Sequence, residues 1–118
     1  MRRAILLVLV LVAAGCGGSG SSEIPTVDPG TAVGLNGKEV IVQGYFSRSP
    51  EASLGQMCAM LDESYPPACS SPALPVSNLT KEGQQKLQLT RDPETGALWS
   101  QNEVELRGHI DEGALVVD

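Results

Sequence analysis

The residues of this chain with the widest chemical repertoire are three cysteines and a single histidine, Cys16, Cys58, Cys69 and His109. A cysteine can accept an acyl chain, form a disulfide or act as a thiolate, whereas a histidine can act as a base or a metal ligand. With one histidine a catalytic relay has no second choice of base, and we expect His109 to lie on a strand surface. No set of residues supplies a nucleophile, a base and oxyanion donors together, so we expect a non-enzymatic protein without a cofactor.

Cys16 follows a segment with the parts of an export signal. Residues 2 and 3 are arginines, residues 4–12 are an unbroken apolar run, and Ala13-Ala14-Gly15 precedes the cysteine. The run is too short for a bilayer core, which needs about 20 residues, and is typical of a signal peptide. The sequence from Ala13 to Cys16 resembles the lipobox of bacterial lipoproteins, departing from it at Ala13, where the pattern usually has Leu or Val. The resemblance implies a signal peptide over residues 1–15, cleavage before Cys16 and acyl chains such as palmitate on this cysteine.

A lipid on Cys16 would hold the chain to the extracytoplasmic side of a bacterial cell membrane. Each buried CH₂ contributes about 0.8 kcal/mol, so two acyl chains already make release from the membrane very slow. The alternative is an ordinary secretory signal cleaved after Gly15, with Cys16 following it by chance.

The charge of the exported part limits its partners. Arg2 and Arg3 lie in the signal, so six basic and 14 acidic residues remain after it, a net charge of −8. Nucleic-acid affinity depends on basic side chains that neutralise phosphates, so we expect no nucleic-acid partner. The expected partners are the membrane, reached through the N-terminal lipid, and an envelope protein or ligand that the sequence does not identify.

Cys58 and Cys69 remain as an even pair if Cys16 carries lipid. Exported chains meet an oxidising environment, in which such a pair forms a disulfide. Closing a loop of this size stabilises a domain by about 3 kcal/mol in the chain-entropy model. The sequence therefore predicts a structural Cys58–Cys69 disulfide.

A metal or redox accessory role is the alternative for the same two cysteines, assisted by Met57, Met60 and His109. The spacing of the cysteines is not Cys-x-x-Cys, and no histidine cluster accompanies them. With the disulfide formed, we expect Met57 and Met60 to fill the core. The acidic pairs at 62–63 and 111–112 lack the spacing of a calcium loop, so we expect them to face water and predict no metal site.

The chain divides into three parts by composition. After the signal at 1–15, residues 16–37 contain the lipid anchor, a Gly/Ser tether and a lead-in rich in Pro and Gly, with turn signals at 28–30 and 36–37. We expect at most one short ordered segment in this lead-in. Residues 38–118 are long enough for one small β-domain.

Two segments alternate between apolar and polar residues, as half-buried strands do. The inward set is Val40, Val42, Gly44 and Phe46 in residues 39–46, and Val104, Leu106, Gly108 and Ile110 in residues 103–110. The glycine in the middle of each segment fits the tight coil of a small barrel. Shorter strands are predicted at 57–61, 73–76 and 114–117, with a weak helix at 80–87. We expect Trp99 to plug one end of the core.

The order of these elements resembles an OB-fold, a five-stranded Greek-key barrel. Residues 35–45 are similar to the opening of many such domains, and residues 57–69 resemble small exported lipoproteins of uncharacterised function. The resemblance implies an all-β domain with small α content and one disulfide, but no particular activity. The nucleic-acid role of some OB-folds does not transfer, because the outward residues Glu39, Glu103 and Glu105 are acidic and the chain has only four aromatic residues.

One surface is a candidate binding patch. The alternation places Ile41 and Tyr45 outside the barrel, and together with Tyr65 from the disulfide loop they would form a small amphipathic surface. The alternative is that the lead-in or the 80–87 helix covers Ile41 and Tyr45.

Overall fold

The longest strand, β2 (Glu39–Arg48), is the centre of the sheet. In the computed structural model, which describes residues 23–118, Val40, Val42 and Phe46 of this strand are buried while Glu39 and Gln43 are exposed. The predicted alternation of residues 39–46 is therefore confirmed.

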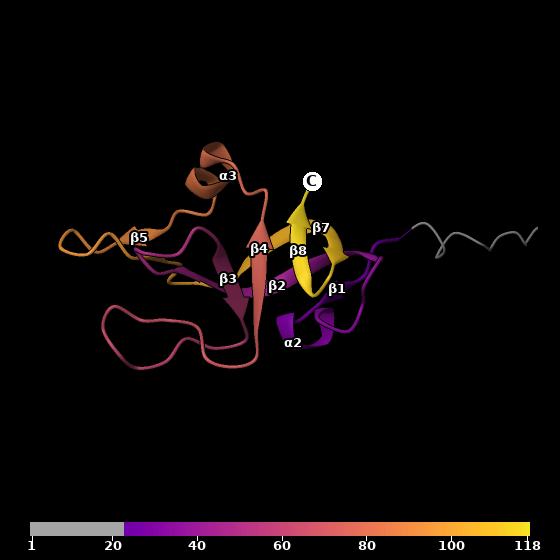
Figure 1. Ribbon diagram of the computed structural model, residues 1–118, viewed down its shortest axis with the longest axis horizontal. Helices are drawn as coiled ribbons and strands as arrows, with labels where there is room; N and C mark the ends of the chain where they lie inside the picture. Colours follow the sequence, from indigo (N-terminus) through magenta and orange to yellow (C-terminus); the bar gives the residue numbers. More distant parts are fainter. Residues whose placement is uncertain (1–22) are drawn as a thin grey trace, which may run out of the picture.

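Five strands, one of which is β2, form a closed barrel (Figure 1). Strand β2 pairs with β3 (Gly55–Cys58), and β3 pairs with β4 (Ala73–Ser77). Strand β4 runs parallel to β8 (Ala114–Val117), which pairs with β7 (Val104–Asp111), and β7 returns to β2. This is the strand order of an OB-like Greek-key barrel, so the predicted fold class is confirmed.

The core consists of the inward-facing apolar side chains of the barrel strands and one alanine from a short helix. Its members are Ala32, Val40, Val42, Phe46, Met57, Leu74, Val76, Leu106, Ile110 and Leu115. The helix is α2 (Pro29–Ala32), which contacts β2, β3 and β4. Asp28 caps it by accepting a hydrogen bond from the Thr31 backbone N–H at 2.7 Å, and Pro29 occupies the first turn.

The lead-in contains two ordered segments, and not one at most as the composition had indicated. Besides α2, the strand β1 (Thr26–Val27) pairs in parallel with β2 at Ile41 and Val42. The turn expected at residues 28–30 is the start of α2, because an Asp-Pro pair suits the cap and first position of a helix as well as a turn. The ordered domain thus begins well before residue 38.

The two mid-strand glycines lie where backbones come closest. A Cβ at Gly108 would clash with the carbonyl oxygen of Val116 on β8, and a Cβ at Gly44 would lie 2.6 Å from the Cys58 carbonyl oxygen. A residue without a side chain is required at both positions, as the tight coil of the barrel predicts.

The second half of β2 carries a small extension beyond the barrel. Strand β6 (Leu98–Trp99) pairs with Ser47 and Arg48, and β5 (Thr90–Arg91) pairs with β6. The predicted helix is present as α3 (Lys81–Lys86), capped by Thr80, whose hydroxyl accepts a hydrogen bond from the Gly83 N–H. Neither α2 nor α3, the helices of the described residues, is long enough to cross a membrane.

Trp99 is buried, but its place differs from the expected one. It pairs with Ser47 across β6 and β2 and is not a member of the core cluster. Its ring lies 5.7 Å from the ring of Tyr65 in an edge-on arrangement. Trp99 therefore packs beneath the disulfide loop and does not plug the barrel.

Candidate functional site

The disulfide between Cys58 and Cys69 is present, as the sequence predicted. The two Cα atoms are 5.5 Å apart, within the usual range for this bond. Cys58 is buried on β3, and Cys69 ends the loop that the bond closes. Cys16, the predicted signal peptide over 1–15 and the predicted tether lie outside the described residues.

Asp62 organises the loop between the two cysteines. Its Oδ1 accepts hydrogen bonds from the Ser64 hydroxyl at 2.6 Å, from the Ser64 N–H and from the Ala68 N–H at 3.1 Å. The Asp62 N–H in turn donates to the Ala68 carbonyl oxygen at 2.8 Å. These bonds to Ser64 and Ala68 hold the pKa of the Asp62 carboxyl below its usual value.

Asp62 does face water, as expected, but it also has this structural role, which the sequence reasoning missed. The Asp-x-Ser spacing could have indicated this role, because it is typical of a turn in which an aspartate side chain accepts a hydrogen bond from the backbone two residues later. The loop is fixed to β2 as well, since the Cys69 N–H donates to the Ser47 hydroxyl at 3.1 Å. The disulfide loop is therefore held at its base by one covalent bond and several hydrogen bonds.

The three residues of the candidate patch lie in different surroundings. The side chain of Tyr65 is 74% exposed, whereas Ile41 and Tyr45 are half-buried. Tyr45 is opposite Cys58 and so lies on the side of the disulfide, as Tyr65 does. Ile41 is four residues away along β2, about 13 Å at the rise of a strand, and lies between β1 and β7.

Strand β1 of the lead-in thus pairs beside Ile41. The patch formed by Ile41, Tyr45 and Tyr65 stays a prediction.

A hollow of about 210 Å³ adjoins the disulfide loop. It separates this loop from residues 49–54, which connect β2 to β3. Most of its lining is apolar: Pro50, Ala52, Leu54, Pro66, Pro67, Ala68 and Ala97, with Ser47, Arg48, Ser49 and Gln56 as the polar part. Leu54 is a large apolar side chain that remains 44% exposed. The sequence reasoning missed this hollow, because its walls are loops without periodicity.

The residues of the metal or redox alternative are not assembled into one site. Met57 faces the core, but Met60 is 66% exposed, so the expectation that Met60 fills the core is wrong. His109 is exposed, as expected, and opposes Glu39, whereas Cys58 opposes Tyr45. The two positions are six residues apart along β2, about 20 Å.

Met60 follows the end of β3 and lies in the disulfide loop, which explains its exposure. Within residues 23–118, no group of three or more His, Cys, Asp or Glu side chains is arranged to hold a metal ion.

Comparison of the chain with models of protein families, with curated proteins and with solved structures finds no match.

Proposed function

We propose that this protein is a lipoprotein of the bacterial cell envelope, anchored by lipid on Cys16, whose barrel is a non-enzymatic binding module. The lipobox-like sequence before Cys16 supports the anchor and the extracytoplasmic location. The binding role rests on one observation, the hollow between residues 49–54 and the disulfide loop.

This hollow has the properties of a binding surface. Its wall is mostly apolar and contains three prolines, which lose little conformational freedom when a partner binds. The disulfide and the Asp62 hydrogen bonds fix one of its sides in advance. Tyr65, on the same loop, offers a rigid and exposed aromatic side chain, the type that often anchors a protein interface.

The position of the hollow also suits an anchored protein. In Figure 1 the described chain begins near β1, whereas β5 and the disulfide loop lie at the opposite end of the barrel. A lipid that precedes β1 would leave the hollow facing away from the membrane.

Photo-crosslinking in whole cells tests both parts of the proposal. A photoreactive amino acid at position 65 is expected to give a discrete adduct with an envelope protein or ligand, and one at His109, exposed on β7, is expected to give none. The Cys16→Ser variant should leave the membrane fraction or remain uncleaved, because it lacks the acyl acceptor. Correctly processed, membrane-bound Cys16→Ser protein would refute the anchor, and equal adducts at the two positions would refute the binding surface.

A further inference from the structure

Two arginines flank a leucine across the extension of the barrel. Arg48 on β2 is directly opposite Leu98 on β6, and Leu98 is directly opposite Arg91 on β5. Directly opposed residues of paired strands project from the same face of a sheet. The two arginine Cα atoms are two strand spacings apart, about 10 Å, a separation that two long side chains can close around one ligand.

These three residues line a second hollow of about 320 Å³, which adjoins the one beside the disulfide loop and shares Arg48, Ser49 and Pro50 with it. Ser49 and Thr95 add hydroxyl groups to it, and no acidic side chain lines it. The Nε of Arg48 donates to the Ala52 carbonyl oxygen at 3.2 Å. This bond orients the guanidinium and leaves its terminal nitrogens available as donors.

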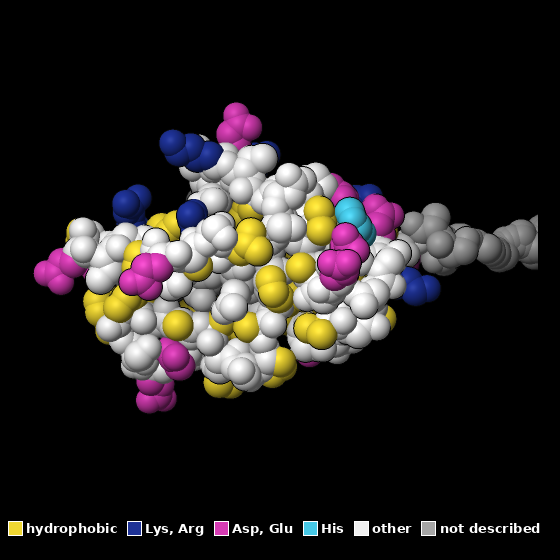
Figure 2. All heavy atoms as spheres, viewed as in Figure 1, with side chains coloured by type: hydrophobic (Ala, Val, Ile, Leu, Met, Phe, Trp, Pro, Cys, Tyr) yellow, Lys and Arg dark blue, Asp and Glu magenta, His cyan; other side chains and the backbone are white. Residues whose placement is uncertain are grey.

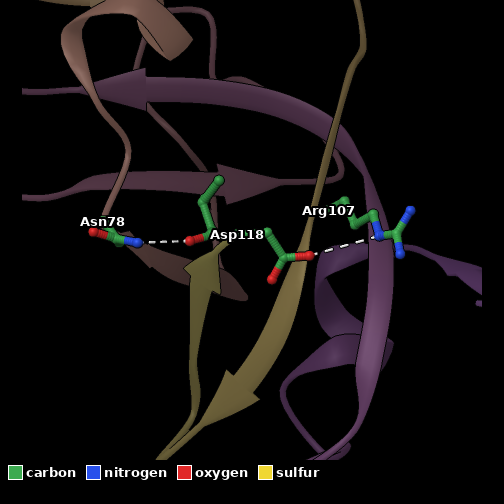
Figure 3. A network of polar contacts seen from close by, with 4 residues as sticks. Asn78, Arg107 and Asp118 are labelled. Carbon is green, nitrogen blue, oxygen red and sulfur yellow. Dashed lines mark hydrogen bonds and ion pairs between the residues drawn. The ribbon is translucent and has the colours of Figure 1, made fainter.

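In the part of the chain that the structure describes, Arg48 and Arg91 have no ion-pair partner, although the chain contains more acidic than basic residues. Of the six basic residues in the exported part, Arg107 has an ion pair, with Asp118 at 3.6 Å (Figure 3). Within residues 23–118, neither Arg48 nor Arg91 has an acidic partner within the same 4.0 Å. In Figure 2 Lys and Arg side chains gather over α3 and β5, although acidic residues outnumber basic ones in the chain.

The nearby acidic groups do not neutralise the pair from within the hollow. Asp92 is buried, and its carboxylate accepts hydrogen bonds from the Thr95 hydroxyl at 2.7 Å and the Glu94 N–H at 3.4 Å. Glu51 and Glu94 are exposed and lie outside the lining. An anion from solution would therefore find two charged donors without displacing an existing ion pair.

We propose that the hollow formed by Arg48, Leu98 and Arg91 binds an anionic oxygen group, a carboxylate or a phosphate, that carries a short apolar substituent. The guanidinium groups donate paired hydrogen bonds to the anionic oxygens, a geometry for which arginine is well suited. Leu98, which is half-buried between them, contacts the apolar substituent. The inference goes beyond the proposed binding function, because it assigns a ligand class to a second hollow next to the one on which that function rests.

The test is a titration of the full chain in non-ionic detergent, followed by amide NMR at constant ionic strength. The probes are butyrate, butyl phosphate and butylammonium. We expect saturable shifts at Ser49, Thr95 and Leu98 with one or both anions and none with butylammonium. The stronger of the two anions indicates whether the source is a carboxylate or a phosphate compound.

Two variants separate a specific site from general charge attraction. Arg91→Gln removes one exposed guanidinium and should weaken anion binding about tenfold, the effect of losing one charged hydrogen-bond partner. The matched control is Arg107→Gln, which removes the same charge from β7 and should leave binding unchanged.

Equal weakening by both variants, or shifts that do not saturate, would overturn the inference. The crosslinks from position 65 and the membrane location of the chain do not depend on Arg91, so their survival would separate this failure from failure of the proposed function.

Discussion

Asp62 illustrates how one exposed carboxylate can determine the shape of a loop. Its hydrogen bonds from Ser64 and Ala68 favour the ionised form, so the pKa of Asp62 is lower in the folded chain than its usual value of 3.8. A lowered pKa means that the stabilisation is complete above the unfolded pKa and is lost as the pH falls through the folded one. The loop should therefore stay ordered at neutral pH and loosen only below pH 3.8.

An NMR titration measures this directly. The amide resonances of Ser64 and Ala68 are expected to shift together with a midpoint below 3.8, reporting the carboxyl that both of them contact. In Asp62→Asn the same resonances should show no such midpoint, while other carboxyl groups still titrate. A midpoint at or above 3.8 in the unaltered protein would contradict the role of Asp62.

For single residues, the sequence predicts the side of a strand on which each one lies where apolar and polar residues alternate. Every second residue of β2 faces inward, and Val40, Val42 and Phe46 of this set lie in the core. The same alternation places Arg48 on their face of the strand, so the position of Arg48 could have been predicted from the sequence. The alignment of Arg91 with Arg48 was not available, because it depends on β6 lying between them. Pairing between segments more than 40 residues apart leaves no local trace in the sequence.

Helices and strands with a local sequence pattern could likewise be predicted, and those that depend on pairing with a distant segment could not. The long strands β2 and β7 could be predicted because alternation over several residues marks them, and helix α3 because residues 80–87 favour a helix locally. The short strand predicted at 57–61 lies earlier, at Gly55–Cys58, where β3 pairs with β2 and β4. Strands β1, β5 and β6 are two residues long, too short for any periodicity, and exist because β2 or β6 offers them hydrogen-bonding partners. The sequence predicts a turn at residues 28–30, where helix α2 begins, because an Asp-Pro pair suits a turn as well as a helix start.

The disulfide loop is the element whose contribution can be measured most directly. Removing the bond in a Cys58→Ala/Cys69→Ala variant should lower the free energy of unfolding by about 3 kcal/mol, chiefly because the unfolded chain gains freedom. Hydrogen exchange should rise most in residues 59–68, while β7, which belongs to the barrel core, should remain the slower of the two and gain no more than the loss of global stability allows.

The matched control is Met60→Ala in the same loop, since Met60 is exposed and its loss should change stability by less than about 0.5 kcal/mol. An equal effect of the two changes on stability, or exchange in β7 as fast as in residues 59–68 of the double variant, would contradict the predicted role of the disulfide.

The two ends of the barrel carry different segments of the chain. The described chain starts near β1 at one end of the barrel, and β5 and the disulfide loop lie at the other end (Figure 1). Residues 48–50 line both hollows, together with the disulfide loop in one and with Arg91 and Leu98 in the other. Strand β2 joins the two ends, and its ten residues span about 30 Å when extended. In the proposed lipid-anchored form, the start of β2 is then nearer to the membrane than its end.

Energy transfer to a lipid-headgroup acceptor tests this orientation in vesicles that carry the lipidated protein. A donor dye attached to Lys38→Cys, just before β2, should transfer more energy than the same dye on Ser49→Cys, just after it. Both positions are exposed, so the dyes should not disturb the core, and mass spectrometry of the Cys58–Cys69 peptide verifies the native disulfide in each variant. The steep distance dependence of the transfer makes a separation approaching 30 Å easy to detect. Equal transfer from the two positions would mean that the barrel lies flat on the membrane, with its hollows no further from the lipid than its first strand.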